Sequence, residues 1–284
     1  MIGLAPPVRD FEQDFRDLVS TRTAAVQLTL NSGSRRVFRA YEQYADHSGN
    51  ATFLLPIKWR RPGRSKALFS NYDVLRGSAL YGELLAIGGA RCPMCGFGEV
   101  STLDHYLPRT AFPEFAILAL NLVPACGRCN QLKGTHVGLE PGVQFLHPFF
   151  DSLAAVPILE CRFSVRAGSA LIEFRIRRTH RVAEDVLSRV RFQFVRLRLA
   201  DRFRAEALAE IGERRTTFSQ YATARGLVGL RDYLRTESRG YVAAHGPNHW
   251  KSALYRSLAR NNAFLAGGYE QIAVQIPVAP TSSL

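Results

Sequence analysis

Two pairs of cysteines constrain the fold of this 284-residue chain more than any other feature. The pairs are Cys92/Cys95 and Cys126/Cys129, and 30 residues lie between Cys95 and Cys126. Cysteines at this spacing supply the four thiolates of a tetrahedral zinc site, and backbone amides within each pair stabilise the sulfurs. Such a site is closed and structural. We therefore expect both ends of the intervening segment to meet at one zinc ion.

The rest of the sequence favours metal binding over disulfide bonding. The N-terminus MIGLAPPVRD has neither the basic nor the apolar region of a secretion signal, and no run of about 18 apolar residues predicts a membrane span. We therefore expect a cytoplasmic protein without membrane contact. A reducing compartment keeps thiols available as metal ligands. The fifth cysteine, Cys161, lies in the apolar run ILECRFSV and is interpreted as a small buried hydrophobic residue.

The charge of the chain indicates the class of its partner. Lysine and arginine number 37 against 24 acidic residues, which gives a formal net charge of +13. An excess of this size favours a polyanion such as nucleic acid or an anionic membrane surface, and the sign alone does not choose between them. Hydrophobic residues make up 46% of the chain, enough to bury one large core or two modest ones.

The segment between the two cysteine pairs has its own pattern. Alternation over residues 100–105 predicts a short strand that ends by Pro108, and residues 120–123 predict a second strand. A helix is expected to begin near Cys129 and to run to Lys133. The cysteine pairs would thus enclose two strands and the start of a helix.

These residues resemble the HNH endonuclease family, whose ββα-metal fold places a two-stranded ribbon and a helix around one metal ion. The runs LDHYLPRTAFPEF, NLVPACGRCNQLKG and FLHPFFD are similar to a bacterial subgroup with paired CxxC zinc knuckles. Some members of that subgroup are nuclease components of anti-phage defence systems. The resemblance implies an α+β fold with an HNH core at 89–151. A mainly helical region, 1–88, would precede the core, and a β-hairpin with basic helices, 152–284, would follow it.

The resemblance also implies roles for individual residues. His105 would be the general base that deprotonates the attacking water. Asp104 and Asn130 would hold the catalytic divalent ion, with Asn130 in the place of the family's final His or Asn. A carboxylate and an amide oxygen suit Mg²⁺ or Mn²⁺ better than Zn²⁺. Asn121 would hold the connecting loop against the first strand and orient His105, so its replacement should cost less activity than replacement of His105.

The implied reaction is phosphodiester hydrolysis that leaves 5′-phosphate and 3′-hydroxyl ends. Arg109 and Lys133 are expected to bind neighbouring phosphates. His147 is expected to hold other site residues in place without binding metal itself. DNA is the favoured substrate. A double-strand break would require a homodimer or two successive nicks. No nucleotide-binding motif is found, so any ATP dependence would come from a partner ATPase or sensor subunit.

The flanking regions carry two basic clusters. The first surrounds Trp59 in a predicted loop and contains Lys58, Arg60, Arg61, Arg64 and Lys66. The second lies on a helix predicted over 180–215, where six arginines fall within residues 189–204. Either cluster suits the backbone of a nucleic acid. The loop cluster could instead be ordinary solvated surface, with Trp59 in a packing role. The helix could instead bind an acidic partner protein.

A second hypothesis from another class stays open. Two CxxC pairs also occur in zinc modules that bind nucleic acid or protein without catalysis. The order of Asp104, His105, Asn121 and Asn130 favours the nuclease, because each of them stands where the HNH pattern requires it. Magnesium-dependent cleavage that depends on His105 would distinguish the two.

Overall fold

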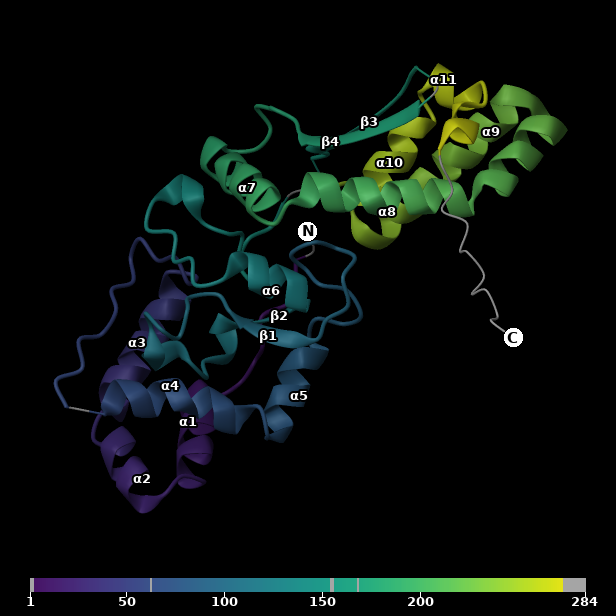
Figure 1. The fold of residues 1–284 in the computed structure, drawn as a ribbon. Coiled ribbons are helices and arrows are strands. Elements are labelled where there is room, and N and C mark those ends of the chain that lie inside the picture. The colour runs from purple at the N-terminus through teal and green to yellow at the C-terminus, as the bar shows by residue number, and fades with distance from the viewer. Residues whose placement is uncertain (1–2, 62, 154–155, 168, 273–284) are drawn as a thin grey trace, which may run out of the picture. The chain divides into compact units, whose positions relative to one another are not determined.

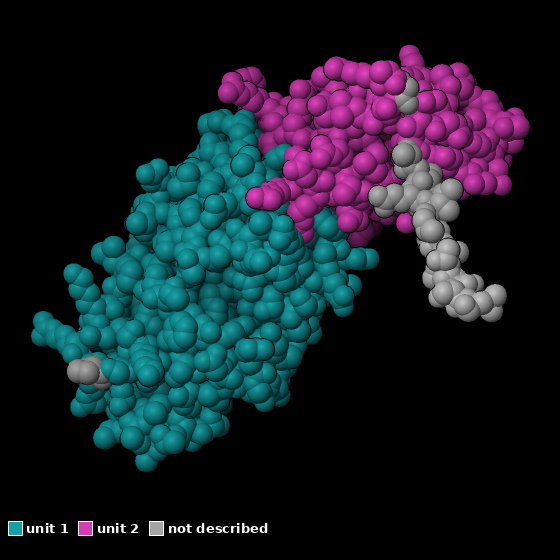
Figure 2. All heavy atoms as spheres, viewed as in Figure 1, with its two compact units in different colours: residues 1–154, 182–197 teal, residues 155–181, 198–284 magenta. Residues whose placement is uncertain are grey.

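The computed structural model describes residues 3–61, 63–153, 156–167 and 169–272, and it divides into two compact units (Figures 1 and 2). Unit 1 comprises residues 1–154 and 182–197, and unit 2 comprises residues 155–181 and 198–284. The described residues form a mostly helical α+β protein with two antiparallel two-stranded sheets. This confirms the predicted class. The regions predicted at 1–88 and 89–151 fall together in unit 1.

Helices dominate the first part of unit 1. They are α1 (Phe11–Ser20), α2 (Ala24–Asn31), α3 (Ser34–Asp46), α4 (Arg64–Leu75) and α5 (Ala79–Ala86). The Asp10 side chain caps α1 by accepting from the Gln13 amide, and Phe15 packs edge-on against Phe38 of α3. A mainly helical region was predicted here. The sequence pattern favours one helix over about 71–87, whereas the structure has two, the first of which begins at Arg64. The division falls at Ser78, whose extended backbone begins α5.

The basic loop before α4 is held by packing and by hydrogen bonds. The centre of the Trp59 ring lies 5.2 and 5.5 Å from the guanidinium carbons of Arg36 and Arg64. Arg64 also donates to the Thr29 carbonyl and to the Ser32 hydroxyl at the end of α2. Of the two roles expected for Trp59, packing and contact with a nucleic acid, the structure shows packing.

The central ribbon of unit 1 is built from β1 (Thr102–His105) and β2 (Leu122–Ala125), followed by α6 (Gly127–Lys133). The strands pair antiparallel, with His105 opposite Leu122, and α5 packs against both strands. Both strands were predicted. Helix α6 begins two residues earlier than expected because Cys126 is its N-cap, with an extended backbone and a thiol that accepts from the Cys129 amide.

The prediction of one long helix over 180–215 is wrong, because the helix is interrupted at Arg198. Helix α7 (Glu184–Arg196) ends before this residue and α8 (Leu199–Glu213) begins after it, and Arg198 has a left-handed φ of 51°. Leu197 and Leu199 are both fully buried. Positions two apart point to different sides of a straight helix, so the turn lets both leucines be buried. Within unit 1, Arg189 of α7 pairs with Asp151 at 2.5 Å, so this arginine is structural.

Unit 2 contains the predicted hairpin and a helical remainder. Strands β3 (Leu159–Arg166) and β4 (Ser169–Ile176) pair antiparallel, α8 packs on β4, and α10 (Trp250–Leu258) packs on β3. The sequence pattern favours a helix over about 218–236, and helix α9 (Arg215–His245) extends beyond it at both ends. Helix α9 is kinked at Gly226, where φ is 64°. Helix α11 (Asn262–Leu265) follows α10. The sequence pattern predicts an irregular tail from Ala266, and most of it, residues 273–284, lies outside the described residues.

No helix in the described part of the chain combines the length and the apolar composition that a bilayer crossing needs.

Candidate metal centre and active site

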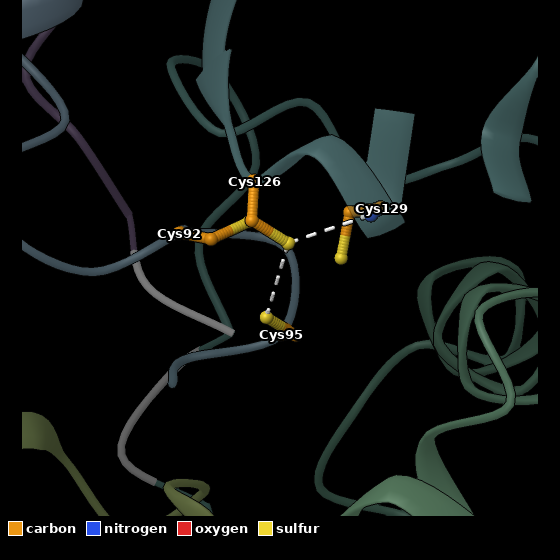
Figure 3. Close-up of side chains that lie close together, drawn as sticks. All are labelled: Cys92, Cys95, Cys126 and Cys129. Atoms are coloured by element: carbon orange, nitrogen blue, oxygen red, sulfur yellow. Dashed lines mark hydrogen bonds between the residues drawn. The ribbon is translucent and has the colours of Figure 1, made fainter. Parts of the chain in front are cut away.

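The four cysteines of the two CxxC pairs meet in the interior of unit 1, as predicted (Figure 3). Their sulfur atoms all lie within 4.8 Å of one another, and the sulfurs of Cys95 and Cys126 are 4.0 Å apart. Four thiolates about 2.3 Å from a zinc ion in a tetrahedron have sulfur–sulfur distances of about 3.8 Å. All four side chains are buried. The cluster therefore fits a closed, structural zinc site.

Tight backbone turns bring the sulfurs into place. The Cys92 amide donates to the Gly98 carbonyl at 2.8 Å, and the Gly98 amide donates to the Cys95 sulfur at 3.4 Å. The second pair repeats this with the Cys129 amide and the Cys126 sulfur at 3.4 Å. A Cβ atom at Gly98 would lie 2.8 Å from the Cys126 sulfur, so the cluster has no room for a side chain at that position.

His105 lies at the end of β1 with its imidazole fixed by a backbone contact. Its Nε2 is 2.9 Å from the Ala116 carbonyl oxygen. A carbonyl only accepts, so Nε2 carries the proton and Nδ1 keeps a free lone pair. Burial, followed by the charges of Arg109 and Lys133, lowers the pKa of His105 to about 3, although the hydrogen bond to the Ala116 carbonyl opposes that fall. The side chain is partly exposed and the ring is neutral at pH 7, so Nδ1 can accept a proton. A pKa of about 3 lies well below the working pH at which a general base is most effective.

Asp104 precedes His105 and lies almost fully buried beside Lys133 of α6. The Lys133 ammonium is 3.2 Å from Asp104 Oδ1 and donates to the His105 carbonyl at 2.6 Å. Burial raises the pKa of Asp104 to about 6, although the Lys133 charge opposes that rise. Among the described residues, Asp104 Oδ2 has no hydrogen-bond partner. One carboxylate oxygen therefore remains available to a cation.

Asn130 lies in the middle of α6, one residue after Cys129. Asn130 and Lys133 are three residues apart, so they share the helix face from which Lys133 reaches β1. The Asn130 side chain is partly exposed, and its amide makes no hydrogen bond within the described ranges. The helix thus places an amide oxygen on the face that meets Asp104.

Asn121 is fully buried and fastens the loop between the strands. Its Oδ1 accepts from the Leu107 amide at 2.8 Å, and its Nδ2 donates to the carbonyls of Leu107 and Phe115 at 3.0 and 3.1 Å. The neighbouring Ala116 carbonyl is the one that holds His105. Asn121 thus fastens the loop that also carries the carbonyl in contact with His105.

His147 supports Asn121 through Tyr44, a residue of α3 whose role here no sequence motif indicates. The Phe149 amide donates to His147 Nδ1 at 3.2 Å, so Nε2 carries the proton and donates to the Tyr44 oxygen at 3.1 Å. Tyr44 donates in turn to Asn121 Oδ1 at 3.0 Å. Burial lowers the pKa of His147 to about 3, so the ring is neutral.

Arg109 is anchored to α4 at the edge of the site. Its Nη1 donates to the Phe69 carbonyl at 3.0 Å and lies 3.1 Å from Asp73 Oδ1, while the guanidinium stacks 4.0 Å from the centre of the Phe69 ring. The neighbouring Tyr72 packs edge-on against His105 with 4.4 Å between ring centres. Helix α4 therefore supplies a wall of the site that the sequence did not indicate.

Replacing Asn121 by alanine is expected to destabilise the protein by about 3 kcal/mol. The change removes the partners of one buried amide and two carbonyls, and each buried polar group left without a partner costs about 1–3 kcal/mol. Tyr44→Phe removes one of the two bonds to Asn121 Oδ1 and leaves one buried donor, His147 Nε2, without its acceptor, so it should cost less, about 1–2 kcal/mol. Urea denaturation measures both. Equal costs for the two variants would show that the amide does not fasten the loop.

Comparison with known proteins gives distant similarities. The chain is 28% identical over 200 residues to Protein ea31 of Escherichia phage lambda, which covers 66% of this chain and 67% of that protein. It is 30% identical over 71 residues to Septu protein PtuB of Bacillus thuringiensis, and this match spans 21% of the chain and 28% of PtuB. No family model and no solved structure matches the chain. Membership of the HNH family stays a prediction.

Proposed function

We propose that this chain is a metal-dependent endonuclease of the HNH type that hydrolyses phosphodiester bonds, with DNA as the favoured substrate. The observation that carries the proposal is the placement of His105. Its Nε2 is held by a backbone carbonyl, its Nδ1 has no hydrogen-bond partner among the residues that the structure describes, and it follows the buried Asp104 on a strand beside a zinc-type cysteine cluster. Similarity to a phage lambda protein and to a Septu protein supports a role in phage biology or anti-phage defence.

His105 is the group that activates water in this proposal. The free lone pair of Nδ1 accepts a proton from the attacking water, and the charge that forms on the ring is stabilised by the Ala116 carbonyl at Nε2. A positioned general base contributes about 10²–10⁴-fold to a reaction rate. The carbonyl contact also prevents the ring from rotating, because the loop that carries it is fastened by Asn121.

Asp104 and Asn130 would hold the catalytic divalent ion. The donor set fits, since Asp104 Oδ2 and the Asn130 amide both lack partners within the described residues, and such oxygen ligands suit Mg²⁺ or Mn²⁺. A bound ion would offset the negative charge that develops on the phosphate and on the leaving 3′ oxygen. Cys129 and Asn130 are adjacent, so the structural zinc fixes one of these ligands.

Lys133 has a positioning role in this proposal rather than the phosphate contact expected from the sequence, because its ammonium is 1% exposed and engaged by Asp104 and by the His105 carbonyl. It ties α6 to the end of β1. Arg109 keeps its proposed role at the phosphate, since its guanidinium is partly exposed beside the site.

Lys133→Met is expected to destabilise the protein by about 3 kcal/mol, because removal of one partner leaves a buried charge without compensation. The double variant Lys133→Met with Asp104→Asn removes both charges, and we expect it to recover at least half of the loss. Chemical denaturation of the four proteins in this cycle gives the coupling free energy. A coupling near zero would contradict the positioning role.

Cleavage of end-labelled DNA and RNA tests the proposed function. With Mg²⁺ we expect cleavage of DNA with 5′-phosphate and 3′-hydroxyl ends, and a supercoiled plasmid should be nicked before it is linearised, since one such site cuts one strand. A homodimer would linearise the plasmid directly. The assay is repeated with any ATPase or sensor subunit encoded beside the chain, because ATP-dependent control would have to come from such a partner.

The second candidate is a zinc-containing module that binds nucleic acid or protein without cutting. The net charge of +13 supports this module, because a basic protein is expected to bind nucleic acid whether or not it cuts it. Tight binding of DNA without cleavage, with Mg²⁺ and with Mn²⁺ and in the presence of the partner, would favour this module over the nuclease.

A further inference from the structure

A hollow of about 450 Å³ lies within unit 2, between the β3–β4 hairpin and α10. Its size is that of a small-ligand site, for which about 300–1,000 Å³ is usual. Polar and charged side chains line most of it. The charged ones are Glu160, Arg162, Arg175, Arg177, Arg256 and Arg260.

Five arginines therefore face one glutamate in this hollow. Glu160 is shared between Arg175, at 2.9 Å, and Arg177, at 3.7 Å. Arg162 and Arg260 are exposed, and within the described ranges neither guanidinium has a hydrogen-bond acceptor or a carboxylate partner. The hollow therefore has a surplus of positive charge that the described residues do not neutralise.

Arg256, one of the five arginines, is held at the hollow by backbone hydrogen bonds. Its guanidinium donates to the Leu159 carbonyl at 2.8 Å and to the Pro247 carbonyl at 3.3 Å, which hold it at the wall of the hollow. Burial lowers the pKa of Arg256, and the charges of Arg260 and Arg177 lower it further. Like charges gathered at a partly buried position cost free energy, and a bound anion would recover it.

The arginines come from separate segments that the fold brings together. Arg162 lies on β3, Arg175 on β4, and Arg256 and Arg260 are four residues apart in and just after α10, so they project from one helix face. Planar guanidinium groups that converge on one concavity match phosphate oxygens, which accept paired hydrogen bonds.

We propose that this hollow binds a ligand with two or more phosphate groups, either a free nucleotide or the backbone of a nucleic acid. The proposal does not depend on the nuclease activity, because the hollow belongs to unit 2 and the cysteine cluster and His105 belong to unit 1.

Binding by the full-length, zinc-loaded chain without added Mg²⁺ tests this proposal. The probes are a fluorescent nucleoside triphosphate and a fluorescent single-stranded oligonucleotide without terminal phosphate. The test variant is Arg162→Ala with Arg260→Ala. The control is Arg235→Ala with Arg239→Ala, two exposed arginines of α9 whose removal changes the net charge equally outside the hollow.

We expect the test variant to raise the Kd of the bound probe about tenfold or more, since two charge-assisted contacts are lost, and the control to change it by less than about twofold. The probe that binds identifies the source of the phosphates. Equal weakening by both variants, or no binding of either probe below about 1 mM, would overturn the proposal. The unfolding midpoints of both variants should equal that of the wild type, because none of the four arginines is buried.

Discussion

Alanine in place of His105 is expected to lower the rate of phosphodiester cleavage by about 10²–10⁴-fold, the range that a positioned general base contributes. The variant loses the Nδ1 lone pair that accepts the proton of water. It should keep its zinc and most of its stability, since within the described part of the chain the side chain makes one hydrogen bond, to Ala116. Single-turnover cleavage measures the rate, so binding and product release do not mask the chemical step.

His136→Ala is the matched control for this prediction. His136 is also a partly exposed histidine of unit 1 whose Nε2 contacts a backbone carbonyl, that of Val143 at 2.6 Å, but it takes no part in the proposed site. We expect this control to cleave within about threefold of the wild-type rate, because no positioned acid or base is lost. Equal losses in the two variants, or full activity of His105→Ala, would remove His105 from the role of base.

Serine in place of Cys129 is expected to release the zinc and to destabilise unit 1 by several kcal/mol. Structural zinc contributes about 10–16 kcal/mol to zinc-finger peptides, and a serine hydroxyl does not replace the thiolate. The cysteine cluster joins the turn before β1 to the start of α6, so its loss separates these segments and misplaces Asn130. Cleavage should fall with the zinc content.

Metal analysis and thermal unfolding measure this second effect. Cys161→Ser is the control, because Cys161 lies on β3 of unit 2 and outside the cluster. That variant should retain one zinc per chain and its cleavage rate. A zinc-free Cys129→Ser protein with wild-type stability and activity would show that the cluster does not build the site.

Local sequence patterns were sufficient to predict the cysteine cluster, both strands of the central ribbon and the hairpin of unit 2. Each of these depends on residues close together in the chain or on the fixed chemistry of thiolates. Tyr44 could not be predicted in the same way, because it meets Asn121 across 77 positions. Its spacing within α3 indicated only a buried helix face. The carbonyl of Ala116 is a backbone group and carries no sequence signal at all.

The environment of Lys133 was beyond sequence reasoning for a related physical reason. Lys133 follows the second cysteine pair in the sequence, and lysine side chains are usually exposed, so a contact with phosphate was expected. Its burial arises only when α6 docks on β1 and the ammonium finds Asp104 and the His105 carbonyl. The turn at Arg198 was missed because apolar residues on both sides of it match a single continuous helix.

We propose that one segment holds two metal sites with separate tasks, a closed cysteine site for zinc and an open oxygen site for the ion used in cleavage. The most direct measurement is the DNA cleavage rate of zinc-loaded protein freed of other divalent ions, before and after addition of Mg²⁺, with zinc content followed throughout. We expect no cleavage until Mg²⁺ is added, and we expect the zinc content to stay at one ion per chain throughout. Cleavage at full rate with zinc alone would contradict this proposal.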